Sequence, residues 1–459
     1  MTLKNKNYLF RWKEILIIAW PLVVANSFWN LQLTIDRLFL AEYSTESLAA
    51  ATAVMGVFWT PMALLQQTSA YLMTFVAQYY GAKRYSMIGP AVWQSIYVSI
   101  FGGVLMLALI PASDAIFNFI EHPVSMRSLE IDYFNSIMTS GLPTALVAAA
   151  SAYFTGLGRT RTIMVINLAG MLANVLFDYM LILGKFGMPE LGISGAGYAT
   201  ALANVVAAIL GLTLVFLDKT EHDYHFKSGF KFNFSLMRRF LKYGLPAGMQ
   251  WALEGLAFTV FLIIVGRMIN GAAALASSGI AVTIMMLSIL PALGIAQAVS
   301  VLVGQHLGEE KPETAEKSTW AGFQVSLIYI LLVGATLVLF PQFYLMWFKN
   351  EADLQLWQQV EFMTPYLLMY VAWFTCFDAM NMNFSFALKG AGDTRFVTSV
   401  ALILPWPIMV LPTWLIHEQP GAIYYSWGFA TIFGMVQAFV FYRRFMGGKW
   451  KLMSVIRDE

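Results

Sequence analysis

Long apolar runs alternate along the chain with short connections that carry charged residues, glycine or proline. A helix of about 20 residues crosses the hydrocarbon core of a bilayer, and the runs reach or exceed that length. The strands of a closed β-barrel would instead give short segments of alternating polarity. The pattern therefore predicts an all-α integral membrane protein with twelve transmembrane helices. The predicted spans are residues 15–40, 48–75, 88–109, 133–154, 162–183, 193–217, 240–268, 275–303, 319–340, 362–388, 396–416 and 423–445.

The composition agrees with a polytopic membrane protein. Of the 459 residues, 59% are hydrophobic and 12% are charged, whereas soluble domains carry about 25% charged residues. The single cysteine, Cys376, excludes an intrachain disulfide. The N-terminus has a basic flank like that of a signal peptide, but no small-residue cleavage site follows a short apolar core. We therefore expect the first apolar run to stay in the protein as its first span.

Lysine and arginine are concentrated on one side of the predicted membrane. The N-terminal tail and every second connection after it hold 23 of the 28 lysines and arginines. Because basic residues are enriched in cytoplasmic loops, both termini are expected in the cytoplasm. The opposite connections hold only Arg37, Arg127, Lys185, Arg267 and Lys349.

Two short motifs occur once in each half of the chain. GLGRTR begins at Gly156 after the fourth span, and GAGDTR begins at Gly390 after the tenth. QYYGAK begins at Gln78 after the second span, and QHLGEEK begins at Gln305 after the eighth. Six spans are an even number, so the repeated halves share one orientation and are related by an axis along the membrane normal. The repeats predict two pseudo-symmetric six-helix lobes.

The longest polar connection divides the twelve predicted spans equally. We expect an amino-terminal lobe at residues 1–217, a cytoplasmic linker at 218–239 and a carboxy-terminal lobe at 240–459. The linker mixes charged and aromatic residues. This mixture favours a short amphipathic helix that lies on the membrane surface.

A carboxylate within an apolar span of the first half needs a partner, because it costs roughly 3 to 17 kcal/mol at membrane depth. Asp36 in the first span has candidate partners in Asn174 and Asp178, which are four residues apart and share one helix face. Thr200 adds a hydroxyl. These oxygens suit Na⁺, with Asp36, Asn174 and Asp178 as candidate ligands, or the two carboxyls could carry a proton. Alternatively, Asp36 pairs with Arg37 near the outer surface while Asp178 caps a helix or snorkels.

The second half carries its acids at different positions. Phe261 stands where the repeat would place a counterpart of Asp36, whereas Glu254 and Asp378 lie deep in apolar runs with no basic residue within three turns. This lobe is expected to bind a coupling ion or a cationic substrate. Polar or amphipathic residues near these acids are candidates for cavity lining. They are Gln250, Tyr366 and Asn381.

Pro21 interrupts the hydrogen bonding of the first span and is expected to kink it. The kink is either a hinge beside Asp36 or a fixed packing feature. The chain contains no Walker loop, zinc motif, haem motif or nucleophile elbow. The sequence therefore predicts neither an enzyme, a bound cofactor nor a nucleic-acid partner.

Together, these residues and repeated turns resemble the multidrug and toxic compound extrusion (MATE) transporters, in particular the NorM-like bacterial branch. The resemblance covers the whole chain and implies a V-shaped arrangement of two lobes in the bacterial cytoplasmic (inner) membrane. It matches Asp36, Asn174, Asp178 and Thr200 to the family's amino-lobe cation or proton site. It also matches Glu254 and Asp378 to the acids of the carboxy lobe.

The resemblance further implies antiport by alternating access. Na⁺ or H⁺ would enter while a small organic compound, cationic and often aromatic, leaves the cell. We expect a monomer whose other partner is the lipid bilayer.

Two other transporter types stay open as alternatives. A major-facilitator-type antiporter would also have two parallel halves, but its usual basic signature is not evident after the second span. A lipid or polysaccharide flippase would need a strongly basic cavity, whereas the charges within these spans are acidic.

Overall fold

The computed structural model describes residues 3–120, 124–218, 224–348 and 354–457, and within these ranges every regular element is helical. The described residues form twelve helices or helix groups that are long and apolar enough to cross a membrane. Each contains most or all of one predicted span. The prediction of an all-α membrane protein with twelve spans is therefore confirmed.

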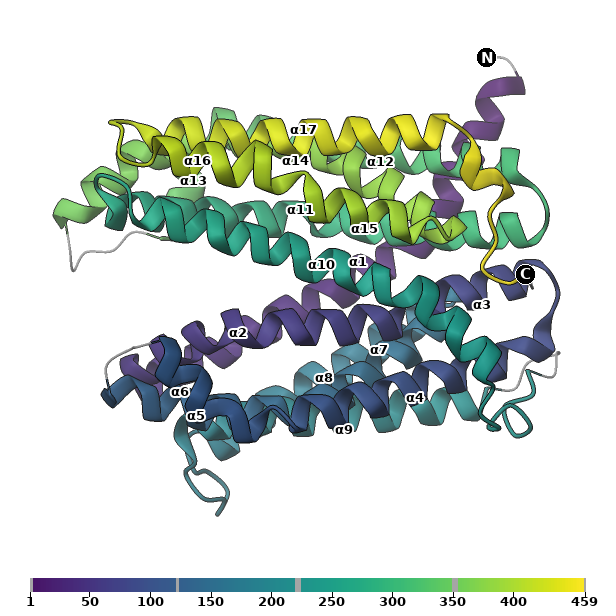
Figure 1. Cartoon of the computed structure of the whole chain (residues 1–459), viewed down its shortest axis with the longest axis horizontal. Helices are drawn as coiled ribbons and strands as arrows, with labels where there is room; N and C mark the ends of the chain where they lie inside the picture. Colours follow the sequence, from purple (N-terminus) through teal and green to yellow (C-terminus); the bar gives the residue numbers. More distant parts are fainter. Residues whose placement is uncertain (1–2, 121–123, 219–223, 349–353, 458–459) are drawn as a thin grey trace. The chain divides into compact units, whose positions relative to one another are not determined.

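Several helices are longer than a bilayer requires, so in a membrane their ends would extend beyond the hydrocarbon core or the helices would tilt. Figure 1 shows the course of these helices along the chain. The helices of the first half are α1 (Leu3–Tyr43), α2 (Thr45–Ala70), α3 (Leu72–Gly81), η1 (Tyr85–Met87), α4 (Ile88–Leu107), η2 (Ile110–Ala112), α5 (Ser113–Ile120), α6 (Val124–Met138), α7 (Gly141–Gly156), α8 (Thr160–Leu181) and α9 (Gly192–Phe216). Those of the second half are α10 (Phe234–Gly266), α11 (Gly271–Gly308), α12 (Pro312–Leu339), α13 (Pro341–Leu345), α14 (Leu354–Ala391), α15 (Thr394–Ile403), η3 (Trp406–Val410), α16 (Leu411–Ile416), α17 (Ala422–Met446) and η4 (Lys449–Leu452).

The chain folds into two compact units that share two helices. One unit holds the start of α1 as far as Val23, together with residues 253–303 and 311–453. The other holds residues 24–252 and 304–310 and the chain from Ser454 on. The predicted linker at 218–239 separates the first six spans from the last six. The boundaries of the compact units instead fall inside two helices, α1 and α10. Each of these two helices contains a proline, Pro21 or Pro246.

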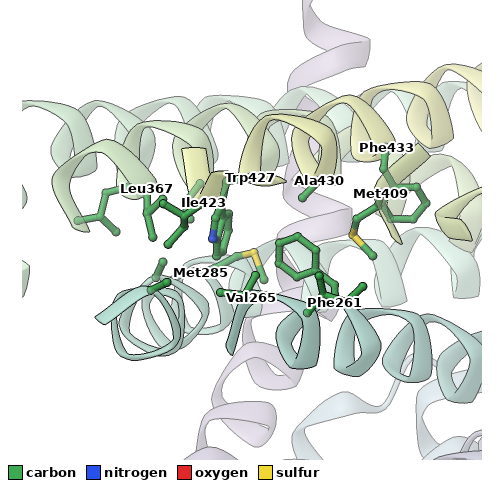
Figure 2. Close-up of a cluster of buried hydrophobic side chains, with 14 of the residues drawn as sticks. Phe261, Val265, Met285, Leu367, Met409, Ile423, Trp427, Ala430 and Phe433 are labelled. Atoms are coloured by element: carbon green, nitrogen blue, oxygen red, sulfur yellow. The ribbon is translucent and has the colours of Figure 1, made fainter. Parts of the chain in front are cut away.

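The first-named unit has a core built from α10, α11, α14, η3 and α17 (Figure 2). Phe261 is fully buried there, and its ring meets that of Trp427 edge to face at 6.1 Å. Trp427 also donates a 3.0 Å hydrogen bond from Nε1 to the hydroxyl of Ser278. The residue that replaces a counterpart of Asp36 is thus a packing element, which explains why no acid stands at that position.

The repeated motifs contact each other in the second-named unit. A Cβ atom added to Gly81 would lie 2.0 Å from the carbonyl oxygen of Gln305, and one added to Gly308 would lie 2.3 Å from that of Gln78. The side chain of Gln305 donates a 2.8 Å hydrogen bond to the carbonyl of Gly156, where the first GLGRTR turn begins. The glycines of this repeat are therefore required by close backbone approach.

The second glycine of each repeated turn has a left-handed backbone. Gly158 has φ of 75° and Gly392 has φ of 107°, which side chains other than glycine adopt at a cost. The residue after it forms an ion pair in both copies. Arg159 contacts Asp218 at 2.9 Å, and Asp393 contacts Arg444 at 2.6 Å.

The described part of the linker is not helical before α10 begins at Phe234. Residues 226–230 form a turn and Lys231 a bend instead, and backbone carbonyls of the segment accept hydrogen bonds from the start of α4. Gly89 N donates to the Tyr224 carbonyl at 2.8 Å, and Trp93 Nε1 donates to the Phe226 carbonyl at 2.8 Å. The predicted amphipathic helix is therefore wrong for this segment, and residues 219–223 of the predicted linker lie outside the described residues.

Candidate functional site

The two acids of the first half meet between α1 and α8. Asp36 is 7% exposed and Asp178 is fully buried, and their carboxyl groups lie within hydrogen-bonding reach of each other. No donor in the described part of the chain reaches Asp36 Oδ1 or either carboxyl oxygen of Asp178. An ionised carboxyl only accepts hydrogen bonds, so this contact is favourable when the pair holds a proton or when a cation lies between the oxygens.

Asn174 extends this polar face of α8 by one turn. Its side chain is fully buried, and neither its amide nitrogen nor its amide oxygen has a partner among the described residues. A buried polar group without a partner costs about 1–3 kcal/mol. Asn174 and Asp178 therefore present unsatisfied groups from one helix face.

A cavity of about 50 Å³ opens beside Asp36, and this is enough for a few water molecules. Thr200 of α9 lines it, so α1 and α9 bring these two predicted residues to the same space. The cavity belongs to a single compact unit. Its lining is Trp29, Gln32, Leu33, Asp36, Met55, Phe58, Trp59, Met62, Gln66, Tyr133, Ile137, Ser140, Thr144, Thr200 and Asn204.

The sequence did not single out several polar residues of this cavity. Tyr133 of α6 is buried with its hydroxyl 3.9 Å from the sulfur of Met55. Asn204 donates a 2.9 Å hydrogen bond to the carbonyl of Thr200, one turn earlier in α9. Asn204 shares a helix face with Thr200 by its four-residue spacing, so that spacing was a usable signal. Tyr133 had no such signal.

One wall of the cavity is aromatic and rich in methionine. The rings of Trp29 and Trp59 lie 5.7 Å apart, and Met55, Phe58 and Met62 line the same space. Aromatic faces attract organic cations, and methionine adapts to different shapes.

Asp36 and Arg37 differ in their surroundings, although they are neighbours in sequence. Arg37 is exposed and Asp36 is buried, as successive residues of a helix point in different directions. Among the described residues no ion pair joins the two side chains. Arg37 attracts Asp36 only at longer range.

The acids of the second half are linked by two amides. Gln437 of α17 donates a 2.8 Å hydrogen bond to Glu254 Oε1 in α10. Asn381 of α14 donates to Asp378 Oδ1 at 3.1 Å and to Gln437 Oε1 at 3.3 Å. Three helices thus join both carboxyls in one network, in which Gln437 was not predicted.

The sequence predicted that these acids are isolated from basic residues, and this prediction is wrong for Glu254, because a lysine from another helix interacts with it. Lys389, three turns beyond Asp378 on α14, interacts electrostatically with Glu254. Its side chain is buried, with Nζ 3.7 Å from the centre of the Phe386 ring. Sequence spacing measured only the distance along each helix, whereas the basic group comes from another span.

The remaining predicted residues lie in different places. Gln250 is buried, but it belongs to the compact unit that contains Asp36. Tyr366 is 49% exposed and contacts the rings of Phe362 and Tyr424. Pro21 lies inside α1, which continues through it as a helix. Among these predicted lining residues, Asn381 donates a hydrogen bond to Asp378.

The described residues contain no group of three or more histidine, cysteine, aspartate or glutamate side chains that could hold a metal ion. The two acid pairs are instead accompanied by amide and hydroxyl groups, at Asn174, Thr200, Asn381 and Gln437.

The model of the MatE family matches residues 21–180 and 246–415. The chain belongs to the MatE family. The two matched segments begin at Pro21 and Pro246, so the family unit occurs once in each half. This membership confirms the predicted resemblance and excludes the major-facilitator alternative. MatE relatives are transporters, so the prediction that the chain is not an enzyme is also confirmed.

Relatives of this MatE chain align over most of its length. A probable multidrug resistance protein NorM of Thermotoga maritima is 27% identical over 456 residues, which cover 97% of this chain and 95% of the relative. A probable multidrug resistance protein NorM of Bacillus subtilis is 24% identical over 399 residues, which cover 86% of each chain.

Solved structures share the fold of this MatE chain. A multidrug resistance MATE family transporter of the MOP superfamily, in an outward-facing conformation, superposes with a TM-score of 0.86 at 21% identity. The superposition covers 98% of this chain and 97% of that one. A MOP superfamily transporter from Pyrococcus furiosus, described as having a binding pocket of reversed polarity, gives a TM-score of 0.85 at 21% identity over 95% and 96% of the two chains.

Proposed function

We propose that this MatE transporter exports small organic compounds, chiefly cationic and aromatic ones, in exchange for Na⁺ or H⁺. The relatives named as probable multidrug resistance proteins support the export of drugs or toxins. The acids buried within the spans support a positively charged cargo or coupling ion.

The observation that carries the proposal is the contact between Asp36 and Asp178. Two interacting buried carboxyls repel each other when both are ionised, and a shared proton or cation removes that repulsion. Loading and unloading this pair therefore favours different arrangements of α1 and α8. A ligand shifts an equilibrium only through such a difference in affinity.

The donor set accommodates either coupling ion. Carboxylate, amide and hydroxyl oxygens from Asp36, Asp178, Asn174 and Thr200 are hard ligands of the type that Na⁺ prefers. The same carboxyls can hold a proton between them. The aromatic wall at Trp29 and Trp59 offers faces for an organic cation, which requires the neighbouring cavity to widen during the transport cycle.

The second acid network offers another cation site in the same transporter. Glu254 and Asp378 are already joined through Gln437 and Asn381. This site would take a coupling ion or the cationic group of the cargo. We also propose that the chain lies in the bacterial cytoplasmic membrane as a monomer, with both termini in the cytoplasm, on the strength of its lysine and arginine distribution.

The test is efflux of ethidium from proteoliposomes in which the Na⁺ and pH gradients are imposed separately. One gradient is expected to drive efflux by the wild-type chain, and Asp36→Asn is expected to abolish that coupling. Asp114→Asn, at an exposed position, serves as the matched control. Full coupled efflux by Asp36→Asn would refute the proposed mechanism. Transport of a fluorescent phospholipid without ethidium efflux would indicate a flippase instead.

A further inference from the structure

An exposed apolar stripe runs along α4. Phe101 is 66% exposed, Val104 is 55% exposed and Leu105 is 52% exposed. Large apolar side chains on the outside of a membrane-spanning helix face lipid tails. One and two turns closer to the start of α4, the same side carries Tyr97 and Trp93. Tyrosine and tryptophan are enriched at the membrane–water interface, where their amphipathic rings lie among the lipid headgroups.

The segment Tyr224–Phe234 is attached to this end of α4. Trp93 donates through Nε1 to the Phe226 carbonyl at 2.8 Å, and its ring lies 5.7 Å from that of Phe230. The Tyr97 hydroxyl donates to the Phe230 carbonyl, and its ring lies 5.8 Å from that of Phe232. The contacts to Phe230 and Phe232 therefore hold the segment on the lipid-facing side of the helix.

Two glycines allow this close attachment. A Cβ atom at Gly89 would lie 2.3 Å from the Tyr224 carbonyl oxygen, and one at Gly229 would lie 2.7 Å from the nitrogen of Pro90. The backbone of the segment is thus packed directly on the start of α4, and its outward side chains have a defined position.

Those outward side chains include three phenylalanines and two lysines. Phe230 and Phe232 are each 60% exposed, and Phe234 is 73% exposed. Lys227 and Lys231 are exposed beside them. Three neighbouring exposed phenylalanines form an apolar patch of the kind that marks an interaction surface.

We propose that the segment Tyr224–Phe234 is an interfacial anchor that binds anionic phospholipid, with the three phenylalanines in the acyl-chain boundary and Lys227 and Lys231 on the headgroups. The patch continues the lipid-facing stripe of α4, which favours a bilayer over a soluble partner. The segment also lies on the side rich in lysine and arginine, where anionic headgroups attract basic residues. Since α10 begins at Phe234, the anchor fixes the start of the helix that carries Glu254.

Lipid binding is tested on the full chain by native mass spectrometry with phosphatidylglycerol and phosphatidylcholine. The double variant Lys227→Gln/Lys231→Gln is expected to bind phosphatidylglycerol about fivefold more weakly for each lysine removed, with phosphatidylcholine unchanged. Lys317→Gln/Lys449→Gln removes the same charge from exposed lysines on other cytoplasmic connections and is the control. An equal loss in both double variants, or no loss in either, would overturn the lysine assignment.

Depth is tested separately by spin labelling of the full chain in lipid nanodiscs, after Cys376→Ala removes the native thiol. A label at Phe232→Cys is expected to be reached by oxygen rather than by a water-soluble relaxation agent, and one at Lys317→Cys is expected to show the opposite. Preferential access of the water-soluble agent at position 232 would overturn the anchor. Neither measurement uses transport, so failure here would leave the proposed export function untouched.

Discussion

Gln437 donates a 2.8 Å hydrogen bond from Nε2 to Oε1 of Glu254, although the two residues are 183 positions apart. The same glutamine accepts from Asn381, which also donates to Asp378. A neutral side chain therefore couples the half-buried Glu254 to the buried Asp378 on a different helix. Asn381 Oδ1 has no partner among the described residues, so it offers an ion in this network a ligand beside the two carboxyls.

Gln437→Leu is expected to remove that coupling. Leucine has a similar size but neither donates to Glu254 nor accepts from Asn381, so unfolding should become easier by about 1–3 kcal/mol. The midpoint of thermal unfolding in detergent measures this change. Gln358→Leu, at an exposed position of α14, is the control and should leave the midpoint nearly unchanged. Equal midpoints for the two variants would show that the network contributes little.

Asp178→Asn is expected to stop coupled transport while the fold is kept. The new amide can donate to the Asp36 carboxylate, so it imitates the loaded pair permanently. Efflux in proteoliposomes should fall by about tenfold or more, because residues 36 and 178 no longer change between a loaded and an unloaded arrangement. The thermal midpoint should stay equal to that of the wild type or rise. A large drop in the midpoint together with normal efflux would contradict this reading of the contact.

Gly308→Ala tests the contact between the repeated motifs. The added Cβ would approach the backbone carbonyl of Gln78 to 2.3 Å, so the helices have to separate at a cost of about 1–3 kcal/mol. Gly56→Ala is a matched control in α2, because nothing lies within 4 Å of its Cβ position. Removing a glycine from a helix interior there should stabilise the protein by about 0.5–1 kcal/mol. The two alanine variants are thus expected to shift the thermal midpoint in opposite directions.

Trp59→Leu is expected to weaken binding of aromatic cations at the cavity beside Asp36. Loss of one ring face should raise the KM for ethidium efflux about two- to thirtyfold, since a cation–π contact is worth about 0.5–2 kcal/mol. Trp414→Leu, at an exposed position, is the control. Trp59→Phe keeps an aromatic face and should recover part of the affinity. If Trp59→Leu and Trp414→Leu have the same KM, the aromatic wall is not a substrate site.

Periodicity and charge predicted the membrane spans because each span satisfies its own backbone hydrogen bonds and must be apolar along its length. The repeated glycine motifs were also visible, since close backbone approach leaves a mark in the sequence. Gln437 was not visible as a site residue, because it stands alone in an apolar run and gains its partner from another helix. Tyr133 was not visible because the other residues that line its cavity come from other helices. The nearness of Lys389 to Glu254 was missed for the same reason.

The backbone conformation of the described part of the linker could not be predicted from the sequence, for a different reason. Its mixed charges and aromatics indicated an amphipathic helix, but side chains of α4 occupy its carbonyl groups and impose turns. Composition predicted a segment at the membrane surface but did not predict the conformation of its backbone. The rings that hold the segment, Trp93 and Tyr97, lie far upstream in the chain.

The division of α1 and α10 between the two compact units has a consequence for assembly. If the gene were cut between spans six and seven, the first polypeptide would carry the N-terminal part of α1, which packs in the unit of the second half. The second polypeptide would carry the N-terminal part of α10, which packs in the unit of the first half. Neither product would be a self-sufficient folding unit. The two fragments should accumulate only when they are synthesised together, so the duplicated halves have become mutually dependent.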